Sequence, residues 1–277
     1  MTETLAVDGG TIAYEVAGSG PLVLLAHGMG DNRAAYRFVA PRLVASGYRV
    51  AAVDLRGCGE SSTGWSSYTR TDVAGDLLAL VRHLGGPAVL VGHSLAGGAV
   101  TIAAAQEPAL VTGIVELAPF TRAQALSPGL LRVRRCRQGM TRLLLTALLG
   151  SVRWWHRYLD VAYPGPKPAD WEDQRRRIGV ELREPGRMKA LQRMGRSPAG
   201  DAGAQLSGVR CPALVVEGSL DPDWADPRVE GEAVVAAMPA GLATLAVVEG
   251  AGHYPHTQFP DDTVELLLAF LREHARA

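Results

Sequence analysis

The sequence predicts an α/β fold, in which a doubly wound, mostly parallel sheet carries an inserted helical cap. Short apolar runs alternate with helical periods up to about residue 120, and the same alternation resumes after residue 208. From about 121 to 205 the chain is rich in Arg and helical in period, without a convincing strand. We therefore expect a core of residues 1–120 and 206–277 and a cap of residues 121–205.

Each expected strand is a short run rich in apolar and β-branched residues. We predict strands at 11–16, 21–26, 48–54, 88–92, 113–117, 213–218 and 243–248. Helical periods connect them, and we predict helices at 33–45, 71–84, 95–106, 227–238 and 261–275. The runs at 21–26 and 88–92 do not alternate with polar residues, which is typical of parallel strands covered on both faces.

Composition excludes several classes of protein. With 277 residues, 47% of them hydrophobic, the chain can bury one substantial core. A formal net charge of zero gives no electrostatic case for binding nucleic acid. No apolar run approaches about 20 residues and the N-terminus does not resemble a signal peptide, so we expect a cytoplasmic protein without stable membrane insertion. The three widely spaced cysteines predict reduced thiols, and we expect no metal or cofactor.

The most informative motif is GHSLAG at 92–97, which matches G-x-S-x-G. It follows an expected apolar strand and begins an expected helix. So tight a reversal needs small flanking residues, which Gly92 and Gly97 supply. The turn would expose Ser94 Oγ at the positive end of the helix, where the backbone N–H of Leu95 faces the position of an oxyanion. Ser94 is therefore the predicted nucleophile.

Several motifs occur in the order found in the α/β-hydrolase family, and the chain resembles the cap-bearing branch of that family. The motifs are HGMG (27–30), DLRGCGES (54–61), GHSLAG (92–97), GSLD (218–221) and GAGHYPH (250–256). The resemblance covers nearly the whole chain, although the cap matches only in position and helical character. This branch includes esterases, lactonases, carbon–carbon hydrolases and cofactor-free perhydrolases. Epoxide hydrolases and haloalkane dehalogenases of this fold carry Asp where this chain has Ser94.

Serine chemistry needs a base, and His253 is the candidate. It follows the strand expected at 243–248, in a Gly-rich loop that can reach the carboxyl edge of the sheet. His93 adjoins Ser94 and should point away from it, because neighbouring residues on such a turn point apart. His256, three residues beyond His253, is a weaker alternative.

The acid is expected after the preceding strand, at 213–218. Asp221 lies three residues after the end of that strand and matches the family pattern. The chain order Ser–Asp–His is the one associated with this fold. Asp223 and Asp226 lie in the same loop and remain alternatives.

Glu116 lies within the otherwise apolar strand expected at 113–117. Some members of the fold place the acid after this strand, so Glu116 is a distant alternative for that role. It could also be a buried carboxylate with a raised pKa. Of the structural roles, we favour an ion pair with an arginine of the cap.

By resemblance, the HGMG motif supplies the second oxyanion donor, the backbone N–H of Met29, beside that of Leu95. His27 in the same motif is interpreted as a structural histidine. Cys58 in the DLRGCGES motif is interpreted as a small packed side chain and not as a reactive thiol.

The cap is strongly basic. Residues 121–200 contain 15 Arg and 2 Lys against 3 Asp and 3 Glu, a net charge of +11, so the remainder carries −11. Docking on an acidic core through ion pairs is the favoured interpretation. The alternative interpretation of the basic charge is that the cap binds an anionic substrate or an acyl carrier protein. For the mixture of basic and apolar residues in the cap, we favour a lid over an acyl pocket to association with a membrane surface. The aromatic residues of this region are interpreted as cap core.

These features predict a serine hydrolase that cleaves an ester, lactone or thioester through Ser94, His253 and Asp221 and an acyl-enzyme. Acyl transfer, perhydrolysis or carbon–carbon bond hydrolysis on the same triad is the first alternative. A ligand-binding protein that only retains the fold is the second. The expected partner is a small-molecule acyl substrate, for which an anionic or a carrier-bound group is an open option. The sequence fixes neither the acyl group nor the oligomeric state.

Overall fold

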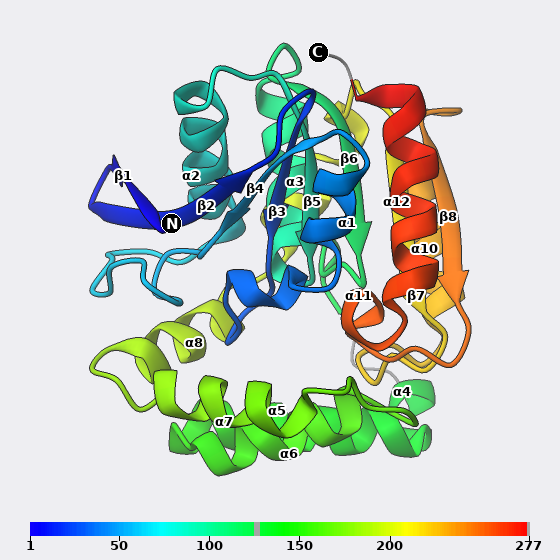
Figure 1. Ribbon diagram of the computed structural model, residues 1–277. Helices are drawn as coiled ribbons and strands as arrows, with labels where there is room; N and C mark the ends of the chain where they lie inside the picture. Colours follow the sequence, from blue (N-terminus) through cyan, green and yellow to red (C-terminus); the bar gives the residue numbers. More distant parts are fainter. Residues whose placement is uncertain (125–127, 276–277) are drawn as a thin grey trace.

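The computed structural model describes residues 1–124 and 128–275. Its strands form one sheet in the order β1-β2-β4-β3-β5-β6-β7-β8 (Figure 1). The pairs from β4 across to β8 are parallel, whereas β2 is antiparallel to both β1 and β4. The strands are β1 (Glu3–Val7), β2 (Gly10–Ala17), β3 (Leu22–Ala26), β4 (Arg49–Val53), β5 (Ala88–His93), β6 (Val111–Leu117), β7 (Ala213–Gly218) and β8 (Ala243–Val248). The predicted fold class is confirmed.

Helices follow most of the strands and return the chain for the next parallel strand. They are α1 (Ala40–Ala45), α2 (Arg70–His83), α3 (Leu95–Gln106), α4 (Pro128–Arg132), α5 (Arg134–Leu149), α6 (Val152–Ala162), α7 (Trp171–Glu181), α8 (Arg187–Arg196), α9 (Gly200–Gly203), α10 (Pro227–Ala237), α11 (Pro255–Gln258) and α12 (Pro260–His274). Two short 3-10 helices are η1 (Arg33–Tyr36) and η2 (Leu206–Gly208).

Two elements near the N-terminus differ from the prediction. The strand β1 was not expected, because its residues alternate between exposed and half-buried positions and form no apolar run. The single helix predicted over 33–45 is instead η1 followed by α1. Asn32 starts η1, since its side chain accepts a hydrogen bond from the N–H of Ala34, and Pro41 lies in the first turn of α1, where a missing N–H costs little.

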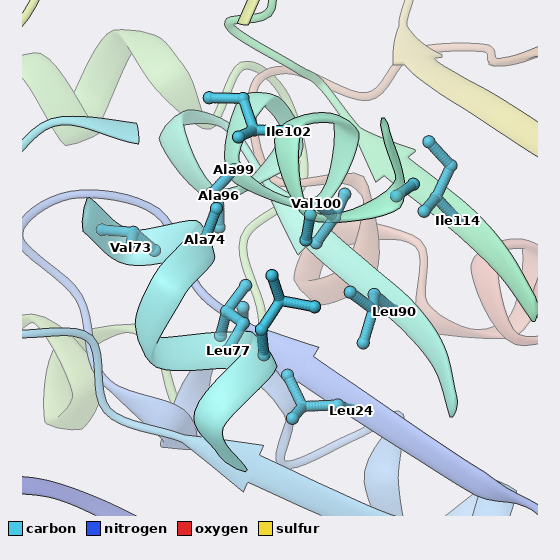
Figure 2. Close-up of a cluster of buried hydrophobic side chains, with 14 of the residues drawn as sticks. Leu24, Val73, Ala74, Leu77, Leu90, Ala96, Ala99, Val100, Ile102 and Ile114 are labelled. Carbon is cyan, nitrogen blue, oxygen red and sulfur yellow. The ribbon is translucent and has the colours of Figure 1, made fainter. Parts of the chain in front are cut away.

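The sheet is buried on both faces, because successive side chains of a strand point to opposite sides. Leu24 of β3 packs into one apolar cluster, together with Leu77 of α2 and Val100 of α3 (Figure 2). Its neighbour Leu25 packs into the opposite cluster, which includes Leu267 of α12. Burying one such side chain contributes about 1.5–3 kcal/mol. Helices on both faces therefore hold the carboxyl ends of the parallel strands in place.

Between β6 and β7 the described residues form helices and loops without a strand. Helices α4–α8 gather beyond the edge of the sheet to which the arrowheads of β6 and β8 point (Figure 1). Helix α6 buries Trp155, Tyr158, Leu159 and Ala162, which is the spacing of one helix face. These side chains form an apolar cluster with α7 and α8 that also includes Tyr254 of the core. The division into a core and a separate cap domain stays a prediction.

None of the helices in the described part of the chain is both long enough and apolar enough to span a bilayer.

Candidate active site

Ser94 occupies a strained turn between β5 and α3. Its φ of 55° and ψ of −116° lie in a region that residues with side chains rarely adopt. Two glycines make this turn possible. A Cβ on Gly92 would lie 2.2 Å from the carbonyl oxygen of Ala96, and one on Gly97 would lie 2.8 Å from Cβ of Pro119. Side chains at Gly92 and Gly97 would therefore push the turn apart. Ser94 itself is 5% exposed.

Met29 and Leu95, the predicted oxyanion donors, line the same pocket as Ser94, which has a volume of about 380 Å³. Neither backbone N–H donates a hydrogen bond within the part of the chain that the structure describes. The loop that carries Met29 packs tightly against the serine, since a Cβ on Gly28 would lie 3.0 Å from Cβ of Ser94. An oxyanion hole needs two such unused donors near the nucleophile, so the oxyanion role of Met29 and Leu95 stays a prediction.

His253 is held by both the core and the helical insertion. Its backbone N–H donates to the carbonyl of Ala162 over 2.9 Å, and its carbonyl lies 2.7 Å from Nε2 of His93. Gly252 permits this close approach, because a Cβ there would lie 2.2 Å from the same Ala162 oxygen. His253 is 3% exposed as a whole residue.

Two carboxylates approach the same nitrogen of His253. The distance from Nδ1 is 2.7 Å to Oδ2 of Asp221 and 3.3 Å to Oδ2 of Asp223. The two aspartates are joined, because the N–H of Asp223 donates to Oδ1 of Asp221 over 2.8 Å. Tyr158 of α6 also donates its hydroxyl proton to Oδ2 of Asp223 over 2.8 Å. Asp226 does not join this group; it caps α10 by accepting from two backbone N–H groups.

The charges of this group shift its pKa values. Burial lowers the pKa of His253, but the negative charges of Asp221 and Asp223, with the hydrogen bond to Asp221, outweigh burial and raise it to about 9. Burial raises the pKa of Asp223, the charge of His253 lowers it and that of Asp221 raises it, with a net value of about 6. Burial and the nearby carboxylates raise the pKa of Tyr158 well above its usual value, so it stays a hydrogen-bond donor.

Asp221, Asp223 and His253 also lie close enough to share a metal ion, since their ligand atoms are within 4.8 Å of one another. Their mutual hydrogen bonds and the one from Tyr158 already pair these atoms.

In the described residues, no hydrogen bond joins Ser94 Oγ to His253. Catalytic hydrogen bonds are often long in the absence of substrate and shorten when it binds.

The buried histidines His27 and His256 hold local structure by hydrogen bonds and ring stacking. His27 accepts from the N–H of Leu55 through Nε2 and lies 2.6 Å from the carbonyl of Gly28 through Nδ1. His256 stacks on Tyr36 with 5.0 Å between ring centroids, and burial and nearby positive charges lower its pKa to about 3.

Cys58 is a buried thiol. Burial, with the charges of Glu181 and Asp54, raises its pKa well above the usual value, so the thiol stays protonated. Thiolate is the reactive form of cysteine. The thiol is therefore a packed side chain, as interpreted from the sequence.

The ion pair favoured for Glu116 is wrong. Its carboxyl group is fully buried and accepts hydrogen bonds from the hydroxyls of Thr101 and Thr121, the latter over 2.9 Å. Burial raises its pKa to about 7 despite these bonds. No arginine reaches it among the described residues, because two threonine hydroxyls take its hydrogen-bonding positions.

Several arginines of the helical insertion donate to backbone carbonyls. Arg135 donates to the carbonyls of Asp221 and Ala225, over 3.2 and 3.0 Å, and so supports the acid loop. Within the described chain, ion pairs between 121–205 and the remainder are limited to Arg122–Glu230 and Arg37–Asp170. Docking through ion pairs therefore accounts for a small part of these contacts.

An eight-stranded sheet of this order, with a strand–turn–helix at Ser94, defines an α/β hydrolase. The model of the alpha/beta hydrolase family matches residues 23–266, and the chain belongs to that family. It is 31% identical over 281 residues to 2-(acetamidomethylene)succinate hydrolase from Mesorhizobium japonicum, covering 96% of this chain and 94% of the relative.

Solved structures share the fold. An esterase from Exiguobacterium antarcticum has a TM-score of 0.82 at 20% identity and covers 98% of this chain and 100% of its own. A thermophilic esterase from Thermogutta terrifontis has a TM-score of 0.73 at 23% identity, covering 99% and 98%. Family and relatives together support a hydrolase.

Proposed function

We propose that the protein is a serine hydrolase that cleaves a carboxylic ester, lactone or thioester through an acyl-enzyme on Ser94. One observation carries the proposal: a serine on a strained turn shares a pocket with two residues whose backbone N–H groups make no hydrogen bond in the described chain. The Asp–His pair after β7 and β8 supports it. Epoxide opening is not proposed, because residue 94 is Ser and not Asp.

In this mechanism Asp221 accepts a hydrogen bond from the Nδ1–H of His253, which leaves Nε2 unprotonated and able to act as a base. His253 takes the proton of Ser94 Oγ as that oxygen bonds to the acyl carbon, and the N–H groups of Met29 and Leu95 stabilise the resulting oxyanion. His253 then returns the proton to the leaving alcohol or thiol. Water, activated by His253, releases the acid and restores Ser94.

The relatives bear on the choice of substrates to test. The Mesorhizobium japonicum relative is named for a succinate derivative, a dicarboxylate, and the fold neighbours are esterases. A useful panel therefore contains p-nitrophenyl esters, lactones and acyl thioesters, with and without a carboxylate. Alcohol acceptors in the same assay separate hydrolysis from acyl transfer.

Replacement of Ser94 by Ala tests the proposal. We expect kcat for the best ester of the panel to fall by about 10⁴–10⁶, with unchanged circular dichroism. The matched control is Ser46→Ala, a serine at the exposed end of α1 that should keep full activity. Turnover by Ser94→Ala at a rate near that of the unaltered protein would refute the serine mechanism.

A further inference from the structure

Arg70 is a buried charge in the pocket of Ser94. It is the first residue of α2, is 4% exposed, and lines the same pocket as Ser94, Met29 and Leu95. Burial lowers the pKa of its guanidinium, and the charge of Asp201 acts in the opposite direction. A buried cation is costly unless something pairs with it.

The contacts of Arg70 hold its side chain but do not neutralise it. Nε donates to the carbonyl of Phe120 over 2.8 Å and Nη1 to the carbonyl of Ser197 over 3.0 Å. Its aliphatic stem lies over Gly98, where a Cβ would be 2.7 Å from Cδ of the arginine. In the described residues, no carboxylate forms an ion pair with Arg70 and Nη2 has no hydrogen-bond partner.

Arg56 is a buried arginine whose charge is paired with a carboxylate, and it is therefore a comparison for Arg70. It is similarly buried, at 7% exposed, and its Nε and Nη2 atoms each donate to a different oxygen of Asp76 over 2.8 Å. Such a bidentate pair satisfies both the charge and the geometry of a guanidinium. Arg70 has the same burial without the acid, and its unused nitrogen belongs to a side chain that lines a cavity.

A single residue links Arg70 to the candidate nucleophile. The N–H of Phe120 donates to the carbonyl of Ser94 over 3.0 Å, and the carbonyl of Phe120 accepts from Arg70. The guanidinium is therefore fixed relative to the serine. Asp223 also lines the pocket and would repel an anion, so a negative group in the pocket is favoured at Arg70.

We propose that Arg70 forms an anion subsite and that the ester cleaved at Ser94 carries a carboxylate, which Nη2 of Arg70 binds. This inference rests on the proposed function and narrows its substrate class. The carboxylate stands either on the acyl chain or on the leaving group. A neutral ester lacks the group that would neutralise the buried guanidinium.

Two matched pairs of esters test the proposal. The first pair is mono-4-nitrophenyl adipate and its methyl ester, with the charge on the acyl chain. The second is 4-acetoxybenzoate and its methyl ester, with the charge on the leaving group. We expect the anionic member of at least one pair to be preferred. Arg70→Met should lower kcat/KM for that anion by about 10- to 100-fold and for its neutral partner by less than about threefold.

Arg70→Lys keeps the charge and should restore part of the preference. The control is Arg193→Met, because Arg193 also bridges to backbone carbonyls but does not line the pocket. Equal losses for charged and neutral esters in Arg70→Met, or no preference in the unaltered protein, would show that Arg70 only supports the fold.

Binding of adipate gives a second measurement that does not depend on turnover. Calorimetry on Ser94→Ala should show adipate binding that weakens with added salt and is lost in Ser94→Ala/Arg70→Met. If the proposed hydrolysis is wrong, neither ester of a pair is cleaved. Adipate still binds in that case if the anion subsite at Arg70 exists. Equal binding with and without Arg70 would overturn the subsite.

Discussion

Replacing Asp223 by Asn should shift the pH profile of kcat/KM rather than abolish activity. Asp223 Oδ2 lies 3.3 Å from Nδ1 of His253, and Asp221 is closer at 2.7 Å. Both charges favour protonated His253, and its pKa rises from 6.5 to about 9 against the opposing effect of burial. Because the base must be neutral, kcat/KM should fall about tenfold per pH unit below this value.

The expected change in the pKa of His253 follows from the loss of one of the two carboxylate charges beside it. An opposite charge within about 4–6 Å moves a pKa by about 1–3. Asp223 is ionised above its own pKa of about 6, so it contributes across the range in which His253 titrates. Asn keeps the shape and can still accept from Tyr158, but it removes one charge. We expect the acidic limb to move to lower pH by about one unit or more, with a gain of about tenfold in kcat/KM at pH 7.

The assay is kcat/KM for a neutral p-nitrophenyl ester, corrected for the ionisation of nitrophenol, from pH 5.5 to 10. The control is Asp226→Asn, since Asp226 caps α10 and, within the described chain, forms no hydrogen bond or ion pair with His253. Asp221→Asn should instead lower kcat by about 10⁴, because it removes the acceptor that orients the imidazole. An unmoved limb in Asp223→Asn would refute the electrostatic argument, and an exchange of the two phenotypes would make Asp223 the acid.

Two further predictions concern stability. Burial raises the pKa of Glu116 from 4.5 to about 7, so ionising it costs the folded state roughly 3 kcal/mol above pH 7 and nothing below about 4.5. Glu116→Gln should therefore unfold at higher urea concentration than the unaltered protein at pH 8, and this advantage should vanish near pH 4.5; a gain independent of pH would contradict the argument. Because Ser94 has a φ of 55°, Ser94→Gly should be more stable than Ser94→Ala by about 1 kcal/mol in thermal unfolding, and the reverse order would show that the turn is not strained.

Much of the fold could be predicted because local patterns determine it. The strands β3 and β5 are unbroken apolar runs, and both are fully buried with parallel neighbours. The strand β1 has no such run and is formed by its antiparallel pairing with β2. Pairing of this kind depends on the partner strand and not on the residues of β1 alone.

The candidate site could be predicted where residues close in sequence form it. It could also be predicted where the order of motifs in the α/β-hydrolase family indicates which residue to choose. The turn at Ser94 depends on glycines within a few residues of it. The hydrogen bond from Tyr158 to Asp223 and the place of Arg70 in the pocket join segments far apart in the chain. Arg70 starts α2 behind a capping Thr69, a pattern that also occurs on exposed helices, so its burial has no local signal.

The central claim is that Ser94 is the nucleophile, and labelling by a fluorophosphonate tests it directly. The protein is incubated with the probe, and intact mass and peptide mapping locate the adduct. We expect one adduct, on Ser94, with loss of esterase activity in proportion to labelling and no adduct in Ser94→Ala. Labelling of another residue, or no labelling of a protein that still cleaves esters, would contradict the claim.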